Sequence, residues 1–293
     1  MKSKLQTVID EEIAAYHNLN EPAPAGEESE KLAAMTTERE MEIERDAHRR
    51  FALARGSRNE FVGREKLLKD IERYLSNESR LPFVVYGPSG SGKSALLARA
   101  VQDVPAESQA IIRFIGVTPR SSDLRSLLMN LCQQFRKRFP VENPLSSDIR
   151  ELIEEFRKQL SQATESQPIV VFLDALDQLA DSDNALRMFW IPFGDLPVNV
   201  KFVVSCLSDR DATDPAGFPF AALHGRKLPT ENWRDLGPLQ PEEARRLLFE
   251  TWLTAAGRTL SESPEQRRRG RMSLSIFLGK NTALLLFLWR ILS

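Results

Sequence analysis

The sequence predicts a three-layer α/β sandwich with a parallel sheet. Short apolar runs alternate with amphipathic helical stretches through the middle of the 293-residue chain, a pattern typical of β-α-β units. The runs at 81–86 and 169–173 are apolar almost throughout, as expected for strands buried on both faces of a sheet. A glycine-rich stretch follows the first run directly, and a chain of this length can bury a sizeable core.

The first 58 residues are predicted to form a helical arm or linker. We expect an amphipathic helix at 4–16, a polar loop around 21–26 and a highly charged helix at 37–54. The mixed charges of the last helix are typical of a solvated face with ion pairs four residues apart. The alternative is an arm that packs on the following domain or tethers an upstream effector.

Residues 87–94, called here the glycine-rich loop, carry the most specific pattern of the chain. They follow the strand predicted at 81–86 and precede a helix predicted at 95–101, the context in which GxxxxGK[ST] indicates a phosphate-binding loop. Backbone N–H groups of such a loop and the start of its helix point at the anion. The alternative is a turn without a ligand. The residues expected to contact nucleotide are Gly87, Pro88, Ser89, Gly90, Ser91, Gly92, Lys93, Ser94 and Ala95.

Two side chains of this loop have separate expected roles. Lys93 can reach the β- and γ-phosphates of a bound nucleotide, so we expect it to contribute to catalysis as well as binding. The Ser94 hydroxyl can bind Mg²⁺. The loop therefore predicts a site for a nucleotide with its metal ion.

Further elements flank this loop. A helix is expected at 66–75, a second strand at 110–117 and two helices at 122–139 and 147–163. Ser121 or Ser122 is the expected N-cap of the first of these two long helices. This alternation continues the predicted β-α-β pattern.

The strand at 169–173 ends in the second chemical element, Asp174-Ala175-Leu176-Asp177-Gln178. A carboxylate at the carboxyl end of such a strand lies beside a phosphate loop, so Asp174 is expected to hold Mg²⁺ directly or through water. Gln178 can orient water but cannot accept its proton at neutral pH, which leaves any general-base role to Asp177. The alternative for Asp177 is a structural helix N-cap.

The remaining elements follow a proline- and aspartate-rich loop. A fourth strand is expected at 199–206, a fifth at 233–236 and an amphipathic helix at 242–256. Residues 272–292 are long and apolar enough for a membrane span, but interior Lys280 and Asn281 argue against one. We expect a lid helix or an atypical tail there.

The sequence Phe-Val-Gly-Arg-Glu at 61–65, about twenty residues before the glycine-rich loop, resembles the entry motif of STAND-class signalling ATPases, especially NACHT and NB-ARC-like members. The acidic pair at Asp174 and Asp177 resembles the extended Walker B motif of that family. The usual form of that motif ends in Asp-Glu, and this chain departs from it at Gln178. The chain also stops before the sensor repeats that the family usually adds.

This resemblance implies a P-loop NTPase domain at 59–236, with five parallel strands in the order 5-1-4-3-2, and a partial helical lid with an atypical tail at 237–293. It also implies nucleotide contacts from Val62 and Arg64 in the entry motif. Ser205 falls where the family places a γ-phosphate sensor, and Pro238 matches a lid proline that contacts the base. These roles rest on the resemblance.

Composition limits the function classes. The 40 basic and 41 acidic side chains give a formal net charge of -1, so bulk charge does not suggest a nucleic-acid partner. Cys132 and Cys206 lie among apolar residues, as reduced core thiols of a cytoplasmic protein do. No secretory signal is evident at the N-terminus. We expect neither nucleic acid nor membrane among the partners.

The expected function is an ATP- or dATP-binding signalling switch that uses Mg²⁺, hydrolyses ATP to ADP slowly and controls assembly with other subunits, including copies of itself. One alternative is an Orc-like AAA+ ATPase acting on DNA, which would need a winged helix and an arginine finger that the sequence does not reveal. Another is a nucleotide-binding fragment without an output of its own.

Overall fold

The computed structural model describes residues 27–56, 64–141, 143–192, 196–208, 213–237 and 243. The chain divides into two compact units, 1–46 and 47–293. Helix α2 (Glu27–Arg55) begins in the first unit and ends in the second. It contains the charged helix predicted at 37–54, whereas the helix predicted at 4–16 lies outside the described residues. The fold described below is that of the second unit.

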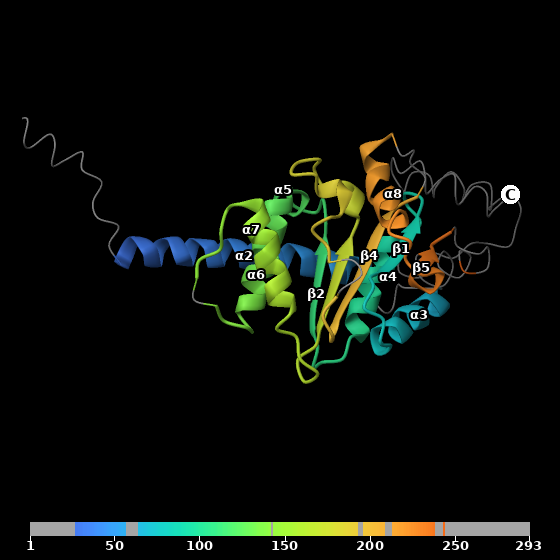
Figure 1. Ribbon diagram of the computed structural model, residues 1–293, viewed down its shortest axis with the longest axis horizontal. Coiled ribbons are helices and arrows are strands. Elements are labelled where there is room, and N and C mark those ends of the chain that lie inside the picture. Colours follow the sequence, from blue (N-terminus) through green and yellow to red (C-terminus); the bar gives the residue numbers. More distant parts are fainter. Residues whose placement is uncertain are drawn as a thin grey trace, which may run out of the picture. The chain divides into compact units, whose positions relative to one another are not determined.

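The second unit is built on a five-stranded, all-parallel sheet (Figure 1). Its strands are β1 (Phe83–Gly87), β2 (Gln109–Phe114), β3 (Ile169–Asp174), β4 (Val200–Leu207) and β5 (Trp233–Asp235). The order across the sheet is β2-β3-β4-β1-β5, which is the predicted order 5-1-4-3-2 read from the other edge. The three-layer sandwich and its topology are therefore confirmed.

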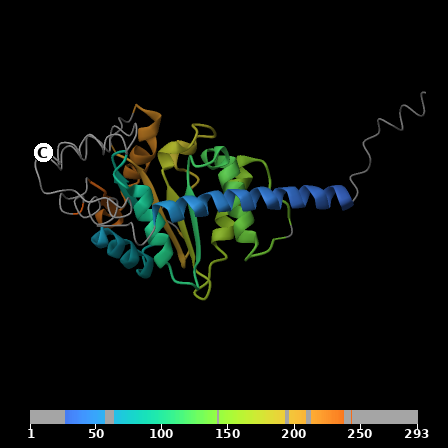
Figure 2. The same ribbon diagram turned by 180° about the vertical axis from the view of Figure 1, so that it is seen from behind.

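Helices cover both faces of this sheet (Figures 1 and 2). The helices after α2 are α3 (Glu65–Ser76), α4 (Lys93–Ala100), α5 (Pro119–Ser122), α6 (Leu124–Arg136), α7 (Ile149–Leu160) and α8 (Phe218–His224). Helices α6 and α7 share a core cluster with Val171 and Phe202, whereas α3 and α4 share another with Phe172 and Val203. Because consecutive strand residues point to opposite faces, the two clusters form the two sides of a sandwich.

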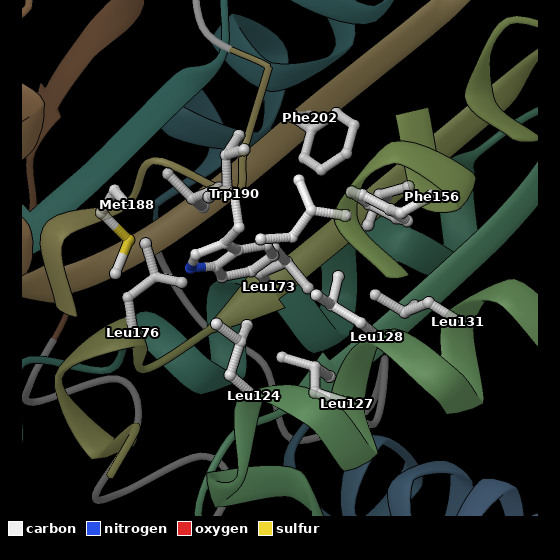
Figure 3. Packing of buried hydrophobic residues seen from close by; sticks show 14 of the residues in the cluster. Leu124, Leu127, Leu128, Leu131, Phe156, Leu173, Leu176, Met188, Trp190 and Phe202 are labelled. Carbon is white, nitrogen blue, oxygen red and sulfur yellow. The ribbon is translucent and has the colours of Figure 1, made fainter. Parts of the chain in front are cut away.

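The larger cluster is centred on aromatic and leucine side chains (Figure 3). Trp190 is fully buried and contacts Phe156, while its indole Nε1 donates to the Ala185 carbonyl at 3.0 Å. That bond satisfies the polar atom of an otherwise apolar ring. Phe156 also packs edge-on against Phe202 of β4, so α7 and the segment around Trp190 are fixed on the same face of the sheet.

The capping prediction for α6 needs correction. The N-cap of α6 is Asp123, whose Oδ1 accepts the Ser126 N–H at 2.8 Å, and not Ser121 or Ser122. Ser121 instead closes a capping box with Thr118 around the short helix α5. The predicted helix at 122–139 is thus preceded by a separate helical turn, because Thr118 and Pro119 together start a helix earlier than the periodicity indicates.

Residues 47–56 pack against the end of β2 and against α4. His48 Nδ1 accepts the backbone N–H of Phe114, the last residue of edge strand β2, at 3.1 Å. Gln102 donates to the Gly56 carbonyl at 2.7 Å. A Cβ added at Gly56 would lie 2.6 Å from the Ala98 backbone, so this close approach to α4 requires glycine.

We predict that neither cysteine reacts while the protein is folded. Burial raises the pKa of the Cys132 thiol to about 12 and also raises that of Cys206, so neither forms a thiolate at pH 8. The expected result with a colorimetric thiol reagent is no reaction in buffer and two reactive thiols in denaturant. Rapid labelling of the native protein would contradict the buried positions of both residues.

None of the helices in the described part of the chain is both long and apolar enough to cross a membrane.

Candidate nucleotide-binding site

The glycine-rich loop joins β1 to α4 with a backbone that depends on its glycines. Gly90 and Gly92 have φ values of 78° and 97°, a left-handed region that disfavours other residues. A Cβ added at Gly87 would lie 2.6 Å from the Leu236 carbonyl oxygen and 3.1 Å from Ser91 Oγ. The loop is therefore held tightly against the segment that follows β5, while its N–H-bearing turn leads into the start of α4.

Lys93 begins α4 and its side chain folds back over the loop. Its Nζ donates to the Gly87 carbonyl at 2.8 Å and to the Pro88 carbonyl at 2.9 Å. The ammonium is thus held where the loop would enclose a phosphate. Within the described residues, the buried hydroxyl oxygen of Ser91 has no hydrogen-bond partner. A buried polar atom without a partner in such a loop fits a missing polar ligand.

Ser94 and Asp174 come together from elements that are 80 residues apart in the chain. The Asp174 carboxylate is 2% exposed at the end of β3 and accepts hydrogen bonds from the hydroxyls of Ser205 and Ser94. Burial raises the pKa of Asp174, and those hydrogen bonds and the Lys93 charge lower it by less. A carboxylate and a hydroxyl are oxygen donors that suit Mg²⁺, which usually retains waters and phosphate oxygens as its other ligands.

The donor set agrees with that limited protein contribution. No group of three or more His, Cys, Asp or Glu side chains among the described residues could hold a metal ion by itself. Ser94 and Asp174 supply two oxygen atoms beside the ammonium of Lys93. The residues present therefore fit a nucleotide-bound Mg²⁺ and not a metal held by protein ligands alone.

Ser205 lies on β4, between β3 and β1, and is fully buried. Its hydroxyl donates to Asp174 Oδ1 at 2.6 Å and accepts the Ala175 N–H at 2.8 Å. The predicted role as a γ-phosphate sensor stays a prediction. Both hydrogen bonds of the Ser205 side chain are made with the segment Asp174–Ala175.

Asp177 lies within a short 3₁₀ helix, Leu176–Gln178, whose N-cap is Ala175. The alternative reading of Asp177 as an N-cap is therefore wrong. Its Oδ1 accepts the Leu207 N–H at 3.1 Å and its Oδ2 accepts the Gln178 amide Nε2–H at 2.8 Å. Asp177 thus ties the turn after β3 to the end of β4, and its general-base role stays a prediction.

Gly116 is a part of this region that the sequence reading missed. Its φ is 87°, and a Cβ added to it would lie 3.2 Å from Cβ of Gln178. The glycine therefore leaves room for the Gln178 side chain beside Asp177. An isolated glycine directly after a predicted strand is the signal that indicates such a close approach.

Three other predicted nucleotide contacts belong to the entry motif and the lid. Val62 and Pro238 lie outside the described residues. Arg64 precedes α3 with a left-handed backbone, φ 65°. Its Nη2 donates to the Gly237 carbonyl, and its backbone N–H donates to Glu243 Oε1 at 3.3 Å. Arg64 thus joins the entry turn to the residue just before Pro238.

Arg64→Ala is expected to weaken the binding of ADP and ATP by similar factors. Burial lowers the pKa of Arg64, but the side chain keeps its charge at neutral pH because arginine titrates far above it. The family resemblance implies that the entry turn lies over the adenine and ribose, which ADP and ATP share, so both nucleotides should lose the same contact. Isothermal titration with both nucleotides measures this. A loss confined to ATP would place Arg64 at the γ-phosphate instead.

A separate hollow of about 1080 Å³ is lined by residues from α3 and from the starts of β3 and β4, including Leu68, Leu75, Ile169, Val200 and Lys201. In a parallel sheet these strand starts lie at the edge opposite to the carboxyl ends. The glycine-rich loop and Asp174 lie at the carboxyl ends, so the hollow is no part of the candidate site.

A parallel sheet with a glycine-rich loop after β1, a lysine and serine at the start of α4, and an aspartate at the end of β3 defines a P-loop NTPase domain. Residues 60–190 match the family model of the AAA ATPase domain. The match includes the loop, Lys93 and Asp174. Nucleotide binding, usually with Mg²⁺, is implied by this family.

Known proteins narrow the class. The chain is 33% identical over 140 residues to human NACHT and WD repeat domain-containing protein 2. This match covers 44% of the chain and 8% of that relative. It is 26% identical over 213 residues to human NACHT domain- and WD repeat-containing protein 1, and this match covers 69% of the chain and 13% of that relative. It is 27% identical over 206 residues to a probable disease resistance protein of Arabidopsis thaliana, covering 70% and 22%.

Among solved structures, an Orc1 protein of Aeropyrum pernix in complex with DNA matches with a TM-score of 0.46 at 14% identity, covering 68% of this chain and 52% of the other. The chain spans 8%, 13% and 22% of the lengths of the three curated relatives. The matched part is a NACHT/NB-ARC-like P-loop ATPase domain, so the resemblance stated from the entry motif is confirmed.

Proposed function

We propose that this chain is an ATP- or dATP-binding switch that uses Mg²⁺, hydrolyses its nucleotide slowly and controls assembly with other protein subunits through its nucleotide state. One observation carries the proposal: the hydroxyl of Ser94 hydrogen-bonds the buried carboxylate of Asp174 beside the folded-back ammonium of Lys93. This arrangement suits a triphosphate with its metal ion. The match to NACHT-containing relatives supports the choice of a signalling role.

Each residue has a defined task in this proposal. Lys93 would exchange its bonds to the loop carbonyls for the β- and γ-phosphate oxygens. Ser94 and Asp174 would hold Mg²⁺, which neutralises charge on those phosphates when it is bound. Asp177 would polarise or deprotonate the attacking water, and Gln178 would orient that water. Residues 59–236 would form the nucleotide domain, 1–58 an arm and 237–293 a partial lid.

Slow hydrolysis follows from the acidic turn. Gln178 occupies the position where the family commonly has glutamate, and an amide cannot accept the proton of water at neutral pH. Asp177 is the remaining carboxylate, and its two oxygens already accept the N–H groups of Leu207 and Gln178. A long-lived ATP state is what a switch requires.

A route for output is supported by residues 47–56. His48 contacts Phe114, which pairs in register with Asp174 across the sheet, and Gly56 contacts α4, which begins with Lys93. A shift of the end of β3 or of α4 on nucleotide binding would therefore change the contacts of residues 47–56 at the end of α2. This supports a nucleotide-dependent change in what the arm presents to another subunit.

The test is to isolate the protein from cells, identify the retained nucleotide by chromatography, and measure its mass by light scattering with Mg²⁺ and either ADP or a non-hydrolysable ATP analogue. We expect a retained adenine nucleotide and a different mass in the two states. Lys93→Ala serves as the control and should show neither. Identical masses with both nucleotides would contradict the switch, and absence of any adenine-nucleotide binding would contradict the whole proposal.

The same preparation tests the DNA-acting alternative. An Orc-like ATPase should bind duplex DNA with an affinity that falls steeply with salt, because each neutralised phosphate releases counterions. The near-zero formal net charge of -1 favours the opposite result. Nucleotide binding without DNA binding and without any change in mass would leave the third reading, a nucleotide-binding fragment.

A further inference from the structure

We propose that Ser205 is a positioning residue that sets the Mg²⁺ affinity of the site by holding the carboxylate of Asp174, instead of contacting the γ-phosphate. The proposal rests on the proposed function, since it concerns the metal that accompanies the nucleotide. It assigns the hydroxyl of Ser205 a partner within the chain. It also explains why a hydroxyl is fully buried among the apolar residues near the end of β4.

The first step is the use of the Ser205 hydroxyl. A serine hydroxyl has one proton to donate. In the structure that proton is directed at Asp174 Oδ1, 2.6 Å away, and one lone pair accepts the Ala175 N–H at 2.8 Å. A phosphate sensor must donate to a phosphate oxygen, and the only proton of Ser205 is already used.

The second step is the position of Ser205 in the sheet. Leu173 pairs with Val204, and Val85 of β1 pairs with Ser205. Ser205 therefore lies between two strands and is 0% exposed. It reaches Asp174 from within the sheet and not from the loops where a nucleotide would enter, so an indirect action through Asp174 fits its place.

The third step is the strained turn after Asp174. Ala175 has φ 58° and ψ 56°, a left-handed conformation that is unfavourable for a residue with a Cβ. The Ala175 N–H donates a hydrogen bond to the hydroxyl oxygen of Ser205. The single hydroxyl thus holds both the carboxylate of Asp174 and the peptide that follows it, so the direction of the carboxylate depends on Ser205.

The two roles predict different measurements. A γ-phosphate sensor affects ATP and not ADP. A residue that positions the metal-binding carboxylate affects the Mg²⁺ dependence of both nucleotides alike, because Mg²⁺ also accompanies the β-phosphate. Binding without metal depends on the loop and Lys93, and should not change.

The experiment is a fluorescent-nucleotide titration of the wild-type chain and Ser205→Ala, with ATP and ADP analogues, first with a chelator and then over a range of Mg²⁺ concentrations. For Ser205→Ala we expect nucleotide affinities in the presence of chelator within about twofold of wild type. The Mg²⁺ concentration that gives half of the increase in nucleotide affinity should rise about tenfold for both nucleotides. Cys206→Ala, a buried change on the next residue of β4, is the matched control and should show no rise.

A second variant, Ser205→Cys, serves if Ser205→Ala does not fold, because it avoids a cavity at the buried site. It replaces the hydroxyl by a weak donor, so it should shift the Mg²⁺ dependence in the same direction as Ser205→Ala. An unchanged Mg²⁺ dependence in the folded variants would overturn the proposal. So would a loss restricted to ATP, which would return Ser205 to the sensor role. If the wild-type chain itself binds neither nucleotide, the proposed function fails, and that result is distinct from both.

Discussion

Lys93→Ala should lower the affinity for ATP and ADP by at least tenfold. The variant loses a charge that pairs with phosphate oxygens, and a charge-assisted hydrogen bond contributes roughly 1.5 to 3 kcal/mol. In the structure Nζ already lies over the loop, bonded to the carbonyls of Gly87 and Pro88, which it would exchange for phosphate oxygens. A titration with a fluorescent ATP analogue measures the effect.

Lys158→Ala provides the matched control for this variant. Lys158 is exposed on α7, so its substitution removes the same charge from the chain without changing the loop. Thermal unfolding shows whether Lys93→Ala keeps its fold despite losing two hydrogen bonds to the loop. Equal affinity in folded Lys93→Ala and wild type would rule out the glycine-rich loop as the phosphate site.

Local patterns were sufficient to predict the buried strands, the glycine-rich loop and the place of Asp174, whereas the order of the strands followed from the family resemblance. The loop is recognisable because a strand, three glycines, Lys93 and a helix follow each other within the sequence. Asp174 is recognisable because it ends a fully apolar run, and the carboxyl ends of parallel strands meet at one edge of the sheet. Both features depend on neighbouring residues in the chain.

The bonds that define the acidic turn depend on pairing across the sheet, which a single sequence does not reveal. Ser205 meets Asp174, and the Leu207 N–H meets Asp177, only because β3 and β4 pair with Leu173 opposite Val204. The cap of α6 was mispredicted for a local reason. Ser121, Ser122 and Asp123 can all cap a helix, and the choice depends on the extra turn that Thr118 begins.

Asp177→Asn should leave ATP affinity nearly intact and lower the rate of hydrolysis by about 10²-fold or more, the usual scale for the loss of a general base. The substitution is nearly isosteric, and its amide oxygen can still accept the Leu207 N–H, so the turn should keep its shape. Asp174→Ala should behave differently. It removes the proposed Mg²⁺ ligand and should harm both Mg²⁺-dependent binding and turnover.

Gln178→Glu completes the series by restoring the carboxylate that the family commonly has. The Gln178 amide lies 2.8 Å from Asp177 Oδ2, so the substitution would place a second proton-accepting carboxylate directly beside Asp177. We expect this variant to hydrolyse ATP faster than wild type. Single-turnover kinetics with a saturating concentration of each protein separates chemistry from binding. If Asp177→Asn hydrolyses ATP at the wild-type rate, Asp177 serves only to join the turn to Leu207, and the chain is a nucleotide-holding switch without a dedicated base.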